Sequence, residues 1–446
     1  MNIGRISNMK HRLVNSNCLI KFLFIFVVFL IPFSGIPQQK FITMESRTFP
    51  GGHKEDGMWT AISAASDGKV YIGLSTFENS AHFYIYDPVK DEFRHRAELI
   101  LILKESGRGI RSNAKIHTPF VEAADGRIYF ASGSMGHGPD EFDPRSWEGG
   151  HWWQYDPKTD ELKDLGLILP QQGVYALVID EKRNILYGTS AWGHFIKFDI
   201  KTGNTTDMGR INNRHTICRT MVIDDEGNVY GSYESFKVFR YNPLSDRIEE
   251  LKIEIPTDKT IWPIKWRTFR PNWRAVVWDD MSKKIYGIDR TSSILFEYDP
   301  KAGKEGKIIE LAQLCAEDYL KAKVIPYATL AFTLGKDRKI YFAPVAQPFD
   351  YTANLGLIEG NVTGSLHYTH FVSYDLKSRK REHHGIIKVE DDAILLGVGG
   401  ATTGPDGTVY LCGAVQEKNS KKAAGKVGGH ELFQMRLIIY RTEDIN

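Results

Sequence analysis

The sequence predicts an all-β protein, a seven-bladed β-propeller with four-stranded blades whose ring is closed by an N-terminal strand. Three observations favour this fold. A unit of two short strands recurs seven times, turn-forming residues separate the strands, and the last copy lacks a strand that the N-terminus can supply. Composition agrees, because 42% hydrophobic and 25% charged residues are globular values, and 40 glycines suit many turns.

The first 37 residues are expected to be a signal peptide. Three basic residues precede an apolar run at 22–33, and small residues follow it. The run is short for a membrane span of about 20 residues, which favours cleavage over a retained anchor. Residues 38–446 would then form a single propeller domain that is secreted or periplasmic and makes no membrane contact after cleavage.

Each repeated unit begins with a polar turn that leads into a tyrosine-containing strand. This first element occurs at 66–73, 124–131, 182–189, 226–232, 282–288, 336–343 and 405–412. A second strand follows each time and reads, in order, FYIYDP, WWQYDP, FIKFDI, VFRYNP, LFEYDP, FVSYDL and LIIYRT. Asp-Gly and Asp-Pro form turns, and the runs between them are rich in β-branched and aromatic residues, so each unit predicts four strands.

The seventh unit is incomplete, because the chain ends soon after its third strand at 437–442. An open last blade would leave exposed strand edges. The segment KFITMESRT at 40–48 follows the signal peptide and can supply the missing strand. We therefore expect this segment to close the ring, and its deletion to unfold the protein.

Charge and cysteine content narrow the function further. The net charge of +2 gives no support to nucleic-acid binding, which requires a basic face. The mature chain keeps Cys218, Cys315 and Cys412, an odd number too widely spaced for a disulfide framework, so we expect small buried hydrophobic residues. We expect a monomer.

The propeller geometry sorts candidate residues by face, because the starts of the innermost strands and of the third strands open on the same side. The innermost strands begin at Trp59, His117, Tyr175, Arg219, Arg274 and Tyr327. The third strands begin at His82, His151, His194 and His370. Long insertions at 131–150, 344–369 and 414–434 fall on that face and would form a wall beside the channel mouth.

Imidazole, phenol and guanidinium groups at one mouth suit β-elimination from a uronic acid. A His or Tyr can abstract the proton beside a carboxylate whose charge an Arg offsets. The expected catalytic residues are His117, His151, Tyr175 and Arg219. The expected substrate-binding residues are Trp152, Trp153, His194, Arg274, Tyr327 and His370, with the tryptophans as plates for sugar rings. For each histidine the competing interpretation is a structural role at a strand end.

The segments KIHTPFVEAADGRIYFAS, GGHWWQYDPKTDELKDLG and GVYALVIDEKRNILYGTS resemble the secreted seven-bladed propeller polysaccharide lyases, the ulvan lyases and their relatives. The resemblance implies a catalytic domain that cleaves a uronic-acid-containing polysaccharide, with glucuronate or iduronate next to rhamnose. It implies that His117 and His151 hold the uronate and that Tyr175 is the acid or base. The family's arginine shortly after Tyr175 is not matched, and Arg219 is the substitute.

Two other functions stay open. A glycoside hydrolase resembling the α-rhamnosidases on this fold would release a sugar without forming a double bond, and His53 would then deserve mutation. A non-catalytic carbohydrate-binding propeller would bind without turnover. Elimination requires no cofactor, and a structural or charge-neutralising metal ion of unknown ligands is left open. The expected partner is an anionic polysaccharide.

Overall fold

The computed structural model describes residues 40–442 except 54, 56, 77–79, 109–110, 135–146, 213–217, 234–235, 259–271, 316–323, 349–368, 418–424 and 428–430. Residues 39–446 form one compact unit, to which everything below refers. The expected signal peptide and most of the three insertions lie outside the described residues.

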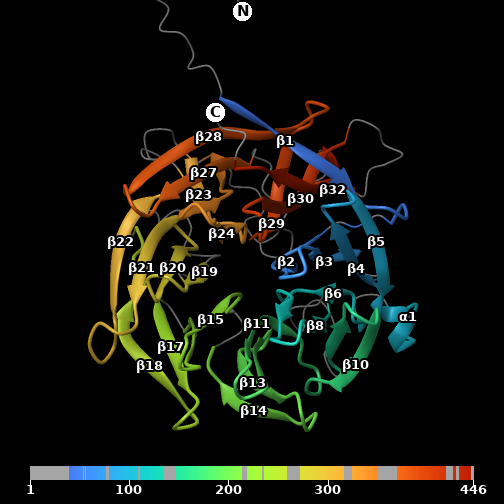
Figure 1. The fold of residues 1–446 in the computed structure, drawn as a ribbon, viewed down its shortest axis with the longest axis vertical. Coiled ribbons are helices and arrows are strands. Elements are labelled where there is room, and N and C mark those ends of the chain that lie inside the picture. Colours follow the sequence, from blue (N-terminus) through green and yellow to red (C-terminus); the bar gives the residue numbers. More distant parts are fainter. Residues whose placement is uncertain are drawn as a thin grey trace, which may run out of the picture. The chain divides into compact units, whose positions relative to one another are not determined.

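Four-stranded antiparallel sheets dominate the chain and stand around a common centre in chain order (Figure 1). The first comprises β2 (Ile62–Ala64), β3 (Val70–Thr76), β4 (Ser80–Asp87) and β5 (Glu92–Glu98). The second comprises β6 (Lys115–Ile116) and β7 (Val121–Glu122), both paired with β8 (Ile128–Gly133), then β9 (His151–Asp156) and β10 (Glu161–Leu167). The third comprises β11 (Val174–Asp180), β12 (Ile185–Ser190), β13 (His194–Asp199) and β14 (Thr205–Arg210).

The next two sheets repeat this pattern. The fourth comprises β15 (Met221–Ile223), β16 (Val229–Ser232), β17 (Lys237–Asn242) and β18 (Arg247–Glu254). The fifth comprises β19 (Trp273–Asp279), β20 (Lys284–Asp289), β21 (Ile294–Asp299) and β22 (Lys307–Gln313). The all-β propeller fold is therefore confirmed.

The last strands belong to one nine-stranded sheet that also contains the N-terminal strand. Its first half is β24 (Phe332–Leu334), β25 (Lys339–Phe342), β27 (His370–Asp375) and β28 (Lys380–Val389). Its second half is β29 (Leu395–Thr403), β30 (Val409–Gln416), β32 (Glu431–Tyr440) and the short β31 (Gly425–Val427). Strand β1 (Phe41–Thr48) lies between the two halves and joins them.

Strand β1 closes the ring as expected, but it does so with both neighbours. Residues Glu45 to Thr48 pair antiparallel with β32 and so complete the last sheet. Residues Phe41 to Met44 pair in parallel with β28 of the preceding sheet. Strand β1 therefore covers β28 at Ile386 to Val389, whereas Lys380 and Glu382 near the start of β28 are exposed.

The core lies between neighbouring sheets rather than in one central mass. One cluster joins Tyr129 and Trp152 of the second sheet to Leu177 and Phe198 of the third. The largest cluster joins the last sheet to the first and second sheets. Each blade thus buries both of its faces, as stacking around a closed ring requires.

The hydroxyl groups of the repeated tyrosines form hydrogen bonds with aspartates in the turns that precede or follow their strands. The Tyr71 hydroxyl donates to Asp67 at 2.8 Å, and Tyr341 donates to Asp337 at 2.7 Å. On the third strands, the Tyr86 hydroxyl donates to Asp91 at 2.6 Å. Asp67 and Asp337 lie in the polar turns that begin their repeats, and Asp91 follows the Asp-Pro turn at 87–88.

Some elements fall outside the repeat. The short helix α1 (Leu99–Leu103) follows the first sheet, and β23 (Val324–Tyr327) pairs only with β26 (Val345–Pro348). Within the described ranges, no helix combines the length and apolar character needed to cross a bilayer. The side chains of Cys218, Cys315 and Cys412 are buried, as expected.

Candidate functional site

A central cavity of about 270 Å³ marks the axis of the ring. Its walls are residues of β2, β11, β15, β19, β24 and β29, together with Pro119 between β6 and β7. These are the innermost strands of their sheets, so the chain passes this channel once in every blade. Side chains that immediately precede the lining residues must therefore meet at one end of the channel.

Bulges and breaks in the innermost strands turn those side chains toward the channel. The pairing of β11 with β12 shifts register between Val174 and Ala176, which leaves Tyr175 at a bulge. The pairing of β19 with β20 shifts in the same way around Arg274. His117 lies in the break between β6 and β7. Bulges of this kind re-aim a side chain away from the regular alternation of a strand.

Three of the expected catalytic residues contact one another there. The rings of His117 and Tyr175 stack with centroids 4.2 Å apart and planes 11° apart. Arg219 Nη1 donates a hydrogen bond to His117 Nε2 at 2.7 Å. His117 Nδ1 lies 3.0 Å from the carbonyl oxygen of Tyr175. Because arginine can only donate, Nε2 carries the lone pair and the ring proton sits on Nδ1.

More positive charge and another aromatic ring complete what we call the axial cluster, made of Trp59, Lys115, His117, Tyr175 and Arg219. Lys115 Nζ lies 3.6 Å from the centroid of the Trp59 ring and 4.9 Å from that of Tyr175. The Arg219 guanidinium carbon lies 5.7 Å from the Tyr175 centroid. A lysine and an arginine over aromatic faces at one end of a channel favour an anionic ligand.

Arg274 lies beside this cluster, one blade further round the ring. Its Nε donates to the carbonyl oxygen of Ala328 at 3.0 Å, and its own carbonyl oxygen accepts from Thr220 at 3.4 Å. The guanidinium is thus fastened to the sixth blade. Arg274 therefore adds charge near the channel while also joining two blades.

The axial cluster is closed in this structure. His117 and Tyr175 are each 1% exposed, and Arg219 is 8% exposed. The sequence predicts residues at an open mouth, but the aromatic and cationic side chains fill the channel end themselves. A ligand reaches the imidazole only if some of these side chains move.

His151 belongs to a different environment, contrary to the expectation that it joins His117. Its Nδ1 lies 2.8 Å from Asp164 Oδ1 on β10, the strand of the second sheet farthest from the axis. Burial alone would raise the pKa of Asp164, but hydrogen bonds from His151 and from the Gly166 amide hold it below its usual value. The two side chains are therefore hydrogen-bonded to each other within the blade.

The same pairing recurs in other blades at a spacing of 13 residues. His194 Nδ1 lies 2.9 Å from Asp207 Oδ2, and Lys237 pairs with Glu250. The first residue of the third strand thus reaches the outermost strand of its own sheet. This register explains why His151 and His194 do not point at the axis.

Trp152 and Trp153 are not sugar-binding plates, since both rings are fully buried. Trp152 stacks on Phe198 at 5.2 Å and donates from Nε1 to Thr205 at 3.1 Å. Trp153 donates from Nε1 to Ser132 at 3.0 Å. Neighbouring strand residues face opposite sides, and in a propeller both sides of a sheet meet another blade. The indoles are therefore packing residues.

A third kind of pair joins two histidines. His370 Nδ1 lies 2.9 Å from His383 Nε2, and His82 Nδ1 lies 3.0 Å from His95 Nε2. Burial, followed by the charge of His53 and then that of His95, lowers the pKa of His82 to about 3. Burial and then His370 lower the pKa of His383 to about 4. These imidazoles are neutral at pH 7.

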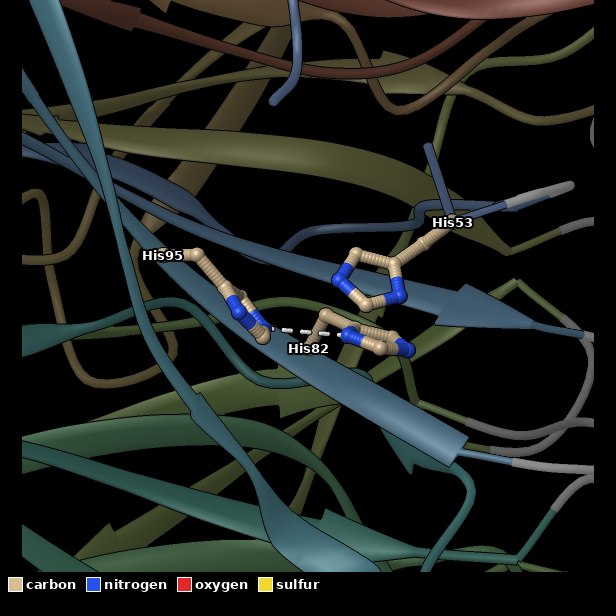
Figure 2. Close-up of side chains that lie close together, drawn as sticks. All are labelled: His53, His82 and His95. Carbon is tan, nitrogen blue, oxygen red and sulfur yellow. Dashed lines mark hydrogen bonds between the residues drawn. The ribbon is translucent and has the colours of Figure 1, made fainter. Parts of the chain in front are cut away.

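Only the first of these pairs gains a third imidazole among the residues that the structure describes. His53, from the segment between β1 and β2, lies over both rings, with centroid distances of 4.2 Å to His82 and 4.8 Å to His95 (Figure 2). One ligand atom from each of the three residues fits within 4.8 Å of the others.

The remaining expected residues stand apart. Tyr327 lies on β23, whose backbone pairs with β26, and its side chain lies outside the described residues. Sequence reasoning missed Lys115 and His95. Lys115 stands two residues before His117, and His95 follows His82 by the 13-residue spacing that also joins His151 to Asp164. The 13-residue spacing could therefore have identified His95 from the sequence.

Comparison with known proteins supports the fold and goes no further. No protein-family model matches the sequence, and no curated protein matches it. A solved chain of the mitotic checkpoint complex is similar in structure, with a TM-score of 0.53 at 11% identity over 98% of this chain and 99% of that one. The extracellular domain of a hybrid two-component system from B. thetaiotaomicron has a TM-score of 0.52 at 10% identity. That match covers 90% of this chain and 40% of that one.

Proposed function

We propose that this protein is a polysaccharide lyase that cleaves a uronic-acid-containing polymer by β-elimination at the axial cluster. The observation that carries the proposal is the contact of His117 with both Tyr175 and Arg219, three residues from three different blades. Elimination beside a carboxylate needs a base, an acid and a cation, and these are the groups that meet here.

The uronate carboxylate is the anion that the cluster would receive. Its negative charge makes the neighbouring C5 proton weakly acidic, so a cation must offset that charge before the proton can leave. Arg219 and Lys115 supply positive charge beside the Tyr175 ring. A guanidinium also matches a carboxylate with two parallel N–H donors.

Binding of the carboxylate would also free the base. In the structure, the lone pair of His117 Nε2 is occupied by the N–H of Arg219. When Arg219 turns its N–H groups to the carboxylate, Nε2 becomes able to accept a proton. The hydrogen bond from Nδ1 to the Tyr175 carbonyl keeps the tautomer that this step requires.

The proton balance closes with Tyr175. His117 Nε2 takes the C5 proton, the C4–O bond breaks, and the C5–H electron pair becomes the C4=C5 double bond. The Tyr175 hydroxyl gives its proton to the departing oxygen, and the proton on His117 later restores the phenol through water. The reaction consumes no cofactor and leaves an unsaturated uronate at one new end.

Catalysis on a polymer requires the closed cluster to open, because His117 and Tyr175 are each 1% exposed. The carboxylate itself can drive the opening, since it offers Arg219 a better partner than a neutral imidazole does. Activity should therefore depend on the acid group of the sugar and vanish on its methyl ester or its reduced form.

The test is a set of uronate polymers, including ulvan, incubated with the full mature chain. We expect ultraviolet absorbance from the unsaturated product, lost in His117→Ala and Tyr175→Phe. Lys237→Ala is the matched control, since Lys237 begins a third strand and pairs with Glu250 away from the axis. Free sugar without absorbance would establish a hydrolase instead. Binding without any product would establish a carbohydrate-binding propeller.

A further inference from the structure

We propose that His53, His82 and His95 form a binding site for a divalent transition-metal ion of the Zn²⁺ class on the first blade. This site is separate from the axial cluster and does not depend on the proposed lyase activity. It rests on three side chains from three places: the segment after β1, strand β4 and strand β5.

The ligand geometry suits such an ion. The three residues can each direct one nitrogen within 4.8 Å of the other two, and His82 Nδ1 already lies 3.0 Å from His95 Nε2. Zn²⁺ binds imidazole nitrogen at about 2.0–2.1 Å, so tetrahedral ligands stand roughly 3.3 Å apart. Small movements of the His53 side chain would close the remaining distance.

The chemistry of the set distinguishes it from the other strand-start histidines. His151 and His194 each face a carboxylate at the same 13-residue spacing and form a hydrogen bond with it. In the first blade that carboxylate is replaced by His95, and His53 adds a third imidazole. Neutral imidazoles are the preferred nitrogen ligands of Zn²⁺, and three of them leave a fourth position for water.

The segment that carries His53 is held in place independently. The Tyr84 hydroxyl donates to the Glu55 carboxylate and lies 3.4 Å from the carbonyl oxygen of Pro50, so it fastens both sides of His53. The Tyr84 ring also packs on His95 with centroids 4.8 Å apart. Such outer contacts orient metal ligands before the ion arrives.

The backbone next to His53 leaves room for its ring. Gly51 has a φ of +97°, and a Cβ atom there would lie 2.7 Å from both Cδ2 and Nε2 of His53. A side chain at this position would therefore push the imidazole away from His82 and His95. The glycine permits both the left-handed turn and the approach of the ring.

Metal binding can be measured on the full mature chain after removal of metals with a chelator. The probes are Co²⁺ and Zn²⁺ alone. We expect one Co²⁺ per chain with the visible absorption of a four-coordinate site, displacement of that Co²⁺ by Zn²⁺, and a melting temperature that rises with Zn²⁺ concentration.

Two variants make the test specific. His53→Ala removes a half-buried ligand from a loop and should weaken Co²⁺ binding by more than about 100-fold, since even the partners of ligands account for roughly 10–100-fold. The double variant His370→Ala, His383→Ala removes the equivalent pair, 2.9 Å apart, from another blade and should bind Co²⁺ like the unaltered chain.

Two results would overturn the proposal. One is a folded chain that binds neither ion at micromolar concentration. The other is an unchanged Co²⁺ spectrum and stoichiometry in His53→Ala, which would place the ion elsewhere. Neither result bears on product formation from uronate polymers, so the two proposals fail or succeed separately.

Discussion

Arg219 donates a hydrogen bond from Nη1 to Nε2 of His117, 2.7 Å away, although 102 positions separate the two residues in the chain. The propeller brings the two side chains together, because each residue lies just before the part of its own blade that lines the central channel. The bond fixes the imidazole tautomer and occupies its basic nitrogen, so it connects stability with the proposed chemistry.

Loss of that donor should affect both properties. Arg219→Ala leaves the buried nitrogen of His117 without this partner, and we expect the free energy of unfolding to fall by roughly 1–3 kcal/mol. Urea titration measures the change. Arg210→Ala is the control, because exposed Arg210 donates from Nε to the Asn212 carbonyl at 3.0 Å and its loss should change stability by less than about 0.5 kcal/mol. Equal effects of the two variants would contradict a special role for Arg219.

The acid role of Tyr175 separates catalysis from folding. Tyr175→Phe keeps the ring that stacks on His117 at 4.2 Å but removes the hydroxyl. We expect kcat to fall by about 10²–10⁴-fold with little change in melting temperature, because positioned proton transfer contributes that much. Initial rates of product absorbance, followed alongside thermal unfolding, give both numbers. An unchanged kcat would assign the acid step to another group.

The histidine pair of β27 and β28 should make stability depend on pH. The pKa of His383 is about 4 in the folded chain, and burial also lowers that of His370, whereas unfolded histidine titrates near 6.5. The unfolded state therefore binds more protons below pH 6.5, and stability falls as the pH decreases from about 6.5 toward 4. We expect a loss of about 2–3 kcal/mol from this pair, since one pKa unit corresponds to about 1.4 kcal/mol.

Urea titration at pH 7 and at pH 4.5 measures this loss. The double variant His370→Asn, His383→Asn cannot titrate in that range and should lose less stability than the unaltered chain between the two pH values. Equal losses would show that other groups govern the acid sensitivity.

Ring closure can be tested within a single strand. Met44 of β1 is 3% exposed, and Met44→Asp would bury a carboxylate between β28 and the last blade. We expect a loss of roughly 3–5 kcal/mol, and deletion of residues 40–48 should prevent cooperative folding. Phe41→Asp is the matched control, because Phe41 lies on the same strand and is 42% exposed. A stable, cooperatively unfolding deletion variant would refute the closing role.

The Gly51 contact predicts a graded effect on metal affinity. Gly51→Ala adds a methyl group 2.7 Å from two atoms of the His53 ring and disfavours the backbone φ of +97°. We expect Co²⁺ affinity to fall by roughly tenfold, less than in His53→Ala, because the ligand is displaced rather than removed. Gly52 also has a positive φ, but a Cβ atom added there would meet no atom within 4 Å. Gly52→Ala therefore measures the effect of backbone strain without the contact with the His53 ring. Equal affinities in the two glycine variants would dismiss the steric argument.

The sequence predicted the repeating strands, the closing strand and the meeting of His117 with Tyr175 and Arg219. These follow from periodicity and from which end of a strand a residue occupies. It did not predict that His151 bonds to Asp164, because that contact depends on the register between two strands and on the bulge in their pairing. Nor did the adjacent tryptophans reveal that both faces of their sheet are covered by other blades.

The double pairing of β1 has a consequence for how the chain is made. Synthesis produces residues 41–48 early, whereas their partners on β28 and β32 lie at 386–389 and 436–439. For nearly all of translation this strand has no native neighbour, and any prematurely terminated product retains an open edge that can recruit other molecules. The ring can therefore close only in chains that contain both β1 and its late-synthesised partners β28 and β32. Truncated chains that lack these partners cannot close it.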